Sequence, residues 1–342
     1  MILPRLRVLQ LGCGGITGTW FHAATHVHDL EFVGLCDLNP GAARLRRDEF
    51  GLLSDIPIFS DFESSLKELR PDVVFDCTIP AAHTSNAILA FENGAHVLSE
   101  KPMSDTLEGA RRALDASAAC GKIYAITQNY RYANGPRRLR AFLESGALGK
   151  VHTVNADMYL APHFGGFREQ MEHVLLLDMA IHTFDMARFL SGTQAERVFC
   201  HEYNPPGSWF DGDACAMATF QMTSDVVFSF RGSWCATGLP SGFASHWRIV
   251  GDRGTVLWDG ADDFRCEVES GEEGFIRATE KLEIPTGEFG TKEQGHGGII
   301  KEFLECVRTG QLPETHANDN LESLKMVLGA VQSSRAQALI SL

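Results

Sequence analysis

A glycine-rich turn near the start of the chain constrains the fold more than any other stretch. Residues 6–11 alternate as a strand, and residues 12–18 then turn the chain into a predicted helix that runs to about His28. A second apolar strand, residues 32–36, ends in Asp37. Strand, glycine loop, helix, strand and acid in this order are typical of a dinucleotide-binding domain.

The turn supplies the predicted cofactor loop, and Asp37 supplies the predicted ribose ligand. Glycines permit the tight turn and the close approach of main chain to pyrophosphate, whose charge meets the helix amino terminus. The third glycine of the G-x-G-x-x-G pattern is Thr17 here, with Gly18 one place later. The alternative is a structural glycine turn without a ligand. The predicted loop residues are Gly12, Cys13, Gly14, Gly15, Ile16 and Thr17.

Asp37 also predicts a preference for NAD over NADP. Its carboxylate would face the extra phosphate of NADP, an unfavourable pairing of about 1–4 kcal/mol at surface-like dielectric values. Leu38 follows it, where an arginine could have received that phosphate. Arg44, Arg46 and Arg47 lie on the next predicted helix, and the expected arrangement for them is a solvent-exposed basic face.

Strands and helices continue to alternate as far as residue 126. Further apolar runs lie at 57–59, 73–77, 95–98 and 123–126. Alternation with helices of about 10 to 15 residues predicts an α/β fold, in which residues 1–127 form a Rossmann domain with a doubly wound parallel sheet. Ser99-Glu100-Lys101-Pro102 follows one of these strands directly. Since ligands bind at the carboxyl ends of parallel strands, we expect this segment beside the glycine loop.

The pattern changes in the second half. Alternating runs joined by short turns lie at 151–159, 214–222, 226–230, 246–250 and 255–258. They predict an α+β second domain, residues 128–342, with a largely antiparallel, open-faced sheet. Its final helices, near 298–308 and 320–338, can pack back on the first domain. An open face that carries Trp, Phe and Met side chains is typically covered, so we expect a homo-oligomer, dimer or tetramer, formed through this sheet.

The stretch around Asp178 is the most informative part of the second domain. Asp178, His182 and Asp185 are spaced by four and three residues, which predicts one shared helix face. A metal site could add His173, but no further Cys or His cluster completes it, so we predict no metal site. A core histidine held by a carboxylate is the second interpretation. A general acid/base pair is the third and favoured one, because histidine titrates near neutrality.

Composition excludes several classes of binding partner. A formal charge of −14 argues against nucleic acid or an anionic membrane, so we expect a small-molecule substrate. No apolar run approaches the roughly 20 residues of a membrane span, and no signal-peptide pattern opens the chain, so we expect a cytoplasmic protein. The nine cysteines include no C-x-x-C pair, which fits neither a zinc site nor a disulfide framework.

Together these motifs resemble the glucose-fructose oxidoreductase and inositol dehydrogenase family (Gfo/Idh/MocA). The most specific part of the resemblance pairs Glu100-Lys101-Pro102 after a strand with Asp178-x-x-x-His182 in the second domain. The family's glycines before this helix are replaced by Glu172-His173-Val174-Leu175, and its glycine two after the aspartate is Ala180. Other matching pieces are the glycine loop, Ile79-Pro80 with His83, Arg131, residues 146–151, residues 249–256 and the final helices.

The resemblance implies reversible hydride transfer between NAD and a secondary hydroxyl of a sugar, cyclitol or related polyol. Lys101 would stabilise alkoxide charge, His182 would remove the proton, and Asp178 would orient the substrate. A cis peptide at Lys101-Pro102 is also implied. Further cofactor contacts would be Pro80, His83, Glu100 and Lys101. The implied substrate contacts are Arg131, His163, Arg168, Asp178 and His182, with Trp209 nearby.

Two other functions use the same fold. A regulator could bind nucleotide and sugar without catalysis, because fold does not fix function. A reductase of an imine or another unsaturated small molecule would use the same cofactor in a different reaction. The presence of Lys101, Asp178 and His182 together favours the dehydrogenase, since a sensor needs no proton-transfer pair.

Overall fold

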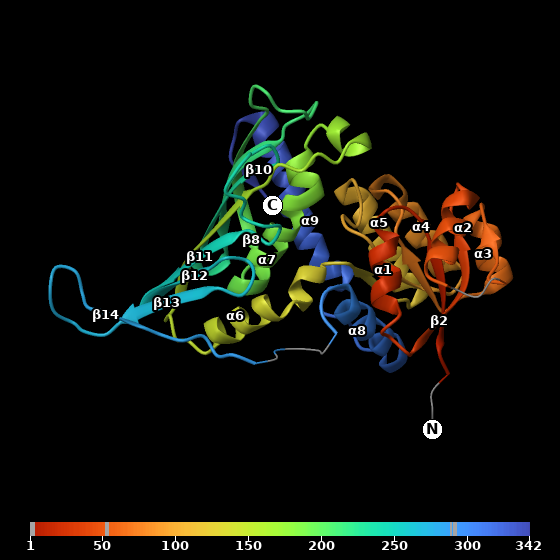
Figure 1. Cartoon of the computed structure of the whole chain (residues 1–342), viewed down its shortest axis with the longest axis horizontal. Helices are drawn as coiled ribbons and strands as arrows, with labels where there is room; N and C mark the ends of the chain where they lie inside the picture. The colour runs from red at the N-terminus through yellow and green to blue at the C-terminus, as the bar shows by residue number, and fades with distance from the viewer. Residues whose placement is uncertain (1–3, 52–54, 288, 290–292) are drawn as a thin grey trace. The chain divides into compact units, whose positions relative to one another are not determined.

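The computed structural model describes residues 4–51, 55–287, 289 and 293–342 (Figure 1). The chain divides into two compact units. Unit 1 comprises Met1–Tyr132 and Thr291–Leu321, and unit 2 comprises Ala133–Gly290 and Glu322–Leu342. The predicted boundary lies after residue 127, whereas the first unit extends to Tyr132 and takes in a second segment from near the end of the chain.

Unit 1 contains a six-stranded, fully parallel sheet in the order β3-β2-β1-β4-β5-β6. This order reverses direction at β1, as in a doubly wound sheet, and it confirms the predicted Rossmann fold. The elements are β1 Leu6–Leu11, α1 Thr17–Ala24, β2 Leu30–Cys36, α2 Pro40–Glu49, β3 Ile58–Phe59, α3 Phe62–Leu69, β4 Val73–Asp76, α4 Pro80–Glu92, β5 His96–Ser99, α5 Leu107–Cys120 and β6 Tyr124–Ile126, followed by a 3₁₀ turn, η1 Asn129–Tyr132.

Helix ends in unit 1 follow local sequence signals. Asn39 caps α2 by accepting a hydrogen bond from the Gly41 main-chain N–H, and Pro40 begins the helix with a φ angle suited to it. Thr106 caps α5 in the same way, and Gly121 ends that helix with a φ of 62°. These caps set the lengths of the helices that flank the sheet.

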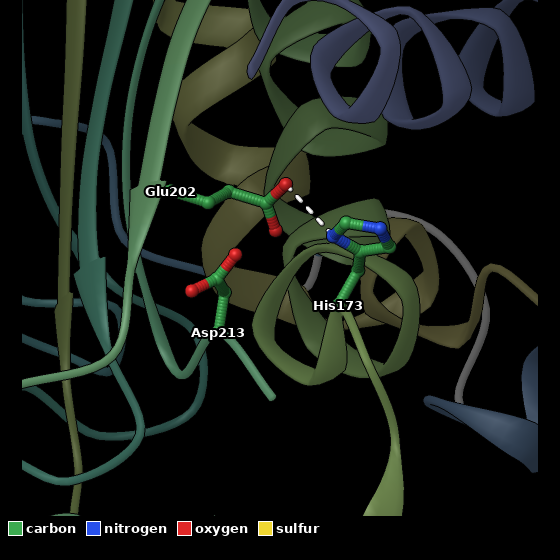
Figure 2. Close-up of side chains that lie close together, drawn as sticks. All are labelled: His173, Glu202 and Asp213. Carbon is green, nitrogen blue, oxygen red and sulfur yellow. Dashed lines mark hydrogen bonds and ion pairs between the residues drawn. The ribbon is translucent and has the colours of Figure 1, made fainter. Parts of the chain in front are cut away.

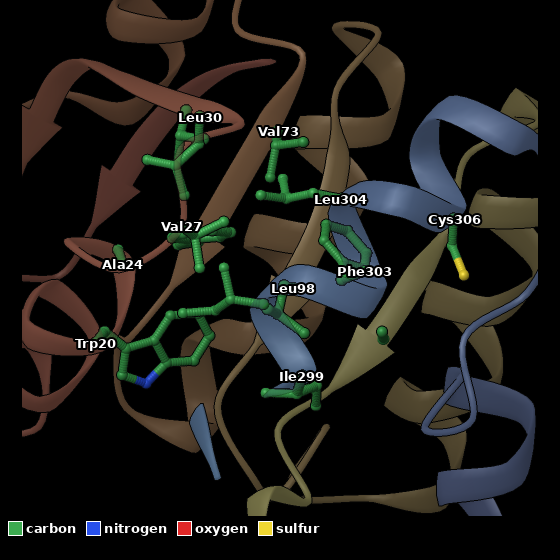
Figure 3. Close-up of a cluster of buried hydrophobic side chains, with 14 of the residues drawn as sticks. Trp20, Ala24, Val27, Leu30, Val73, Leu98, Ile299, Phe303, Leu304 and Cys306 are labelled. Carbon is green, nitrogen blue, oxygen red and sulfur yellow. The ribbon is translucent and has the colours of Figure 1, made fainter. Parts of the chain in front are cut away.

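The core of unit 1 includes a helix from the end of the chain. In α8, His296–Thr309, the apolar side chains Ile299, Phe303 and Leu304 pack with Trp20 of α1 and Leu98 of β5 (Figure 3). All five are essentially inaccessible to solvent. At about 1.5–3 kcal/mol for each fully buried large side chain, this contact makes α8 an integral part of unit 1.

Unit 2 contains a nine-stranded mixed sheet in the order β14-β13-β12-β11-β7-β10-β9-β8-β15. Neighbouring strands are antiparallel except β7 and β10, which confirms the largely antiparallel prediction. Four strands, β8, β13, β14 and β15, were not predicted. The strands are β7 Val151–Tyr159, β8 Ala195–Tyr203, β9 Cys215–Met222, β10 Val227–Ser233, β11 His246–Gly251, β12 Gly254–Trp258, β13 Phe264–Glu269, β14 Thr279–Lys281 and β15 Ile340–Ser341.

Helices cover one face of this sheet (Figure 1). They are α6 Asn134–Glu144, α7 Ile181–Ser191 and the later part of α9 Ala317–Ala336. Phe184 of α7 packs edge-on against the sheet residues Phe220, Phe228 and Phe230.

The opposite face is open and carries Phe and Met side chains as predicted, but not the predicted Trp side chains. Trp247 and Trp258 are buried, since alternation along β11 and β12 directs them to the covered face. Phe199, Tyr203 and Met217 are exposed on the open face instead.

Among the described residues, no helix has both the length and the apolar character that a membrane span requires.

Candidate functional site

The glycine loop of unit 1 has the shape of a ligand cradle. Gly12 has a φ of +79°, and a Cβ placed there would lie 2.7 Å from the Cys77 main chain, so the fold itself requires this glycine. Gly14 and Gly15 are different, because their φ angles are ordinary and no described atom lies within 4 Å of an added Cβ. Main chain without side chains at these two positions is what the close approach of a pyrophosphate requires.

Thr17 replaces the third glycine without disturbing the loop. Its buried hydroxyl donates a hydrogen bond of 3.0 Å to the Gly12 carbonyl oxygen and thereby pins the turn. Helix α1 begins directly after Ile16, and no described side chain caps its amino terminus. Burial, followed by the charge of Asp37, raises the pKa of the Cys13 thiol to about 12. The Cys13 thiol therefore stays neutral near pH 7, and the residue contributes to the loop through its main-chain N–H, which donates to Asp37.

Asp37 lies at the end of β2, beside the loop. Its carboxylate accepts hydrogen bonds of 2.7 Å from the main-chain N–H groups of Cys13 and Asn39. These two bonds fix the carboxylate at the position that the sequence predicted for ribose binding.

Arg46 of α2 reaches the same loop, which the sequence did not predict. Its guanidinium donates to the Gly14 carbonyl oxygen at 3.0 and 3.2 Å and to the Gly15 carbonyl oxygen at 3.4 Å. The expectation that this side chain belongs to a purely solvent-exposed face was wrong. The spacing of residues along the helix could not predict this contact, because Arg46 and the loop are more than 30 positions apart in the sequence.

The sheet register brings the Lys101 segment to the edge that carries the glycine loop. Leu11 of β1 pairs with Asp76 of β4, and Asp76 pairs with Ser99 of β5. Gly12 and Glu100 therefore leave the sheet at the same end. The Lys101–Pro102 peptide bond is cis, as the resemblance implied. Lys101 itself is half-buried.

The Glu100 carboxylate contacts side chains inside unit 1. The sequence predicted a cofactor contact for it. Its Oε1 accepts a 2.7 Å hydrogen bond from the Trp20 indole and lies 3.7 Å from Nε2 of His296. Burial would raise the pKa of Glu100, but His296, Lys101 and the Trp20 hydrogen bond together lower it to about 2. Glu100 therefore anchors the segment before Lys101. Trp20 and His296 are positioning residues that the sequence did not reveal.

His83 is held by two main-chain contacts inside unit 1. It is fully buried, and its two ring nitrogens lie 2.7 Å from the Pro102 carbonyl oxygen and 3.1 Å from the Thr78 carbonyl oxygen. These contacts fix the turn that contains Pro102, and the cofactor contact of His83 stays a prediction. Pro80 begins α4 and is half-buried at the same sheet edge.

Arg131 forms an ion pair inside unit 1, and its substrate contact stays a prediction. Its side chain is buried, and its Nη2 donates to Oδ2 of Asp319 at 2.8 Å. Both residues belong to unit 1. The ion pair ties the η1 turn to the beginning of α9.

In unit 2, Asp178 and His182 lie on one continuous helical segment. Asp178 is in a π-helical stretch, η3 Leu175–Ala180, and His182 follows in α7. The Asp178 carboxylate accepts a 3.0 Å hydrogen bond from the Arg168 guanidinium and remains partly exposed. His182 is nearly buried.

Asp185 lies in the same helical segment, one turn after His182. It is buried and accepts a 2.7 Å hydrogen bond from the Ser323 hydroxyl, with Arg188 at 3.6 Å. His182 and Asp185 both lie in the regular helix α7, and only Asp178 lies in the π-helical stretch, so the shared face of the three residues stays a prediction.

Aromatic rings lie in the loops before and after this helix. The exposed His163 ring stacks on Trp209 with a centroid distance of 3.8 Å, and the Trp209 indole donates to the Pro162 carbonyl oxygen at 3.0 Å. The Arg168 guanidinium lies over the rings of Phe164 and Phe167. Arg168, His163 and Trp209, which were predicted from their loop positions alone, therefore have aromatic partners.

A parallel doubly wound sheet with a glycine loop and an acid at the end of its second strand is typical of a dinucleotide-binding domain, and here a second unit with a mixed sheet follows it. Residues 6–128 match the oxidoreductase family with an NAD-binding Rossmann fold, and residues 136–257 match the GFO/IDH/MocA C-terminal domain. The chain belongs to the Gfo/Idh/MocA family and is an NAD(P)-dependent oxidoreductase.

Individual relatives agree with this assignment. D-glucoside 3-dehydrogenase of Escherichia coli is 30% identical over 59% of this chain and 59% of its own length. D-apiose dehydrogenase of Paraburkholderia graminis is 24% identical over 99% of this chain and 90% of its own. A solved oxidoreductase from Agrobacterium radiobacter, in complex with NAD+, L-tartaric acid and magnesium, shares the fold at a TM-score of 0.86 with 18% identity, covering 98% of each chain.

Proposed function

We propose that the protein oxidises a secondary hydroxyl of a sugar, cyclitol or related polyol and transfers the hydride to NAD, in a reversible reaction. The relatives named above as dehydrogenases of a D-glucoside and of D-apiose support this substrate class. NAD, when bound, supplies the hydride acceptor, and the bare main chain at Gly14 and Gly15 would hold its pyrophosphate.

The observation that carries this proposal is the common sheet edge of the glycine loop and Lys101. A cation on this edge can approach the reacting end of a bound dinucleotide. We assign to Lys101 a hydrogen bond to the reacting hydroxyl, which stabilises the alkoxide charge as the hydride leaves. Glu100 and His83 hold the segment on either side of Lys101, so the amine is aimed by fixed neighbours.

We assign proton removal to His182. A neutral imidazole is a suitable base near pH 7, and its nearly buried ring limits exchange of the proton with bulk water. Asp178, which Arg168 orients, would accept hydrogen bonds from neighbouring substrate hydroxyls. The stacked pair His163 and Trp209 offers an apolar ring surface suited to the C–H face of a sugar.

The test is a screen of NAD reduction against sugars, polyols and cyclitols, followed by Lys101→Ala and His182→Ala on the best substrate. Each variant should lose about 10²-fold or more in kcat while it still binds NADH. The matched controls Lys67→Ala, on the surface of α3, and His28→Ala, on an exposed turn, should behave as wild type. Binding of NADH and sugar without any turnover would favour a sensor, and turnover of imines alone would favour the reductase.

We further infer that copies of the chain associate through the open face of the nine-stranded sheet. Phe199, Tyr203 and Met217 are exposed there, on the neighbouring strands β8 and β9. Apolar side chains gathered on one sheet face are typical of an interface. Light scattering should give a dimer or tetramer, and Phe199→Lys with Met217→Lys should give monomer. A monomeric wild-type chain at micromolar concentration would contradict this inference.

A further inference from the structure

Three segments of unit 2 bring together a histidine and two carboxylates that are not among the residues assigned to catalysis. His173 precedes η3, Glu202 lies on β8, and Asp213 lies just before β9. One potential ligand atom from each lies within 4.8 Å of the other two. Figure 2 shows one Glu202 oxygen directed at the His173 ring and the other directed toward Asp213.

The local fold builds this cluster through main-chain contacts. The Asp213 N–H donates to the Glu172 carbonyl oxygen, and the Asp211 N–H donates to the Glu169 carbonyl oxygen, each at 2.8 Å. A Cβ at Gly212 would lie 2.3 Å from the Glu172 carbonyl oxygen, so only glycine allows this approach. The loop is therefore held against the segment before η3, and this contact brings Asp213 to His173.

Glu202 has an unsatisfied oxygen at the centre of the cluster. Its side chain is 0% exposed, and Oε2 lies 3.0 Å from Nδ1 of His173. Its Oε1 is buried and has no hydrogen-bond partner among the described residues. A buried oxygen that faces a second carboxylate is unfavourable unless a proton or cation lies between them.

Nearby positive charge does not satisfy both carboxylates. Arg335 donates to the Glu172 carboxylate at 2.8 Å. A protonated His173 would neutralise Glu202 alone, through Nδ1, and would leave Oε1 facing Asp213. A divalent cation would interact with all three groups at once.

We propose that His173, Glu202 and Asp213 bind a divalent transition-metal ion, for which Zn²⁺ is the closest chemical match. One imidazole nitrogen with two carboxylate oxygens suits Zn²⁺ better than Mg²⁺ or Ca²⁺, which favour oxygen ligands. With metal–ligand bonds of about 2.1 Å, neighbouring ligand atoms lie about 3.0–3.4 Å apart. The separation of 3.0 Å between His173 Nδ1 and Glu202 Oε2 already falls within this range.

The surroundings of His173 also suit a metal ligand. Its Nε2 is buried without a hydrogen-bond partner among the described residues, and Oε1 of Glu172 lies 3.7 Å away. Metal-bound histidines commonly direct their second nitrogen at a carboxylate, and a small shift of Glu172 would complete that contact. The ion would join β8 and the 211–213 loop to the start of the helical segment that carries Asp178. Its role is structural, because it fixes where that segment begins.

Zn²⁺ titration of the full-length, chelator-treated protein tests this proposal, with calorimetry for stoichiometry and thermal unfolding for stability. We expect one ion per chain and a higher Tm with Zn²⁺. Glu202→Gln and Asp213→Asn should each weaken binding at least about tenfold. The matched control Glu196→Gln, exposed on the same strand, should bind as wild type. Co²⁺ in place of Zn²⁺ should give a visible absorption band that His173→Ala abolishes.

Two results would overturn the proposal. One is a wild-type chain without a stoichiometric site, which would leave His173 and Glu202 as a proton-linked pair. The other is a site that survives in the Glu202 and Asp213 variants, which would place the ion on surface histidines. If Glu202→Gln fails to fold, the half-buried Asp213→Asn variant still decides the question, because its carboxylate is not in the core.

Discussion

Replacement of Asp37 by Asn should change the cofactor preference of the enzyme. The wild-type carboxylate, fixed by the N–H groups of Cys13 and Asn39, would face the 2′-phosphate of NADP. Two like charges about 4 Å apart repel by about 1 kcal/mol in water and about 4 kcal/mol near a protein surface. The ratio of kcat/KM for NAD to that for NADP should therefore fall by about fivefold to 10³-fold in Asp37→Asn.

The same substitution also has a predictable cost in stability. An amide offers one acceptor oxygen, so one of the two main-chain N–H groups loses its partner, at about 1–3 kcal/mol. Steady-state kinetics with both cofactors and chemical unfolding would measure the two effects. Asp48→Asn, an exposed position on α2, should change neither. A folded Asp37→Asn variant with the wild-type cofactor ratio would refute the role of this carboxylate.

Two further predictions concern the glycine loop and pH. Gly12→Ala should lower the free energy of unfolding by about 1–3 kcal/mol, because its Cβ meets the Cys77 main chain at a positive φ; Gly14→Ala should leave stability unchanged but weaken NAD binding, and equal effects in both assays would contradict the cradle. Burial, followed by the charge of Lys122, lowers the pKa of His96 to about 4, and its Nδ1 accepts the Ile123 N–H at 2.9 Å. The unfolded chain therefore binds the extra proton first, so stability should fall by about 1–2 kcal/mol as pH drops from about 6.5 to about 4. In His96→Asn, the free energy of unfolding, measured by chemical unfolding, should depend less on pH over this range. An unchanged pH dependence would contradict the role of His96.

The sequence predicted the features that depend on local periodicity. The glycine loop, Asp37, the parallel alternation and the position of Lys101 all follow from short-range patterns and the rules of parallel sheets. The contacts that required long-range packing were not predictable. Glu100 and Arg131 look like ligand-binding residues in sequence, yet each meets a partner nearly 200 positions away, His296 and Asp319.

Local rules also failed where the backbone departs from ideal geometry. The spacing of Asp178 and His182 was interpreted on a regular α-helix, but Asp178 lies in the π-helical η3. The cluster of His173, Glu202 and Asp213 joins residues 29 and 40 positions apart from the first, across a strand and a loop that were not predicted as neighbours. Nothing in the spacing of these residues indicates a site.

Turnover of Lys101→Ala, measured as NADH formation on the best substrate, tests most directly whether this lysine serves the reacting hydroxyl, with NAD affinity determined separately by fluorescence. We expect a loss of about 10²-fold or more in kcat with NAD affinity within a few-fold of wild type. A variant that turns over at the wild-type rate would contradict the assignment of this lysine to the reacting hydroxyl.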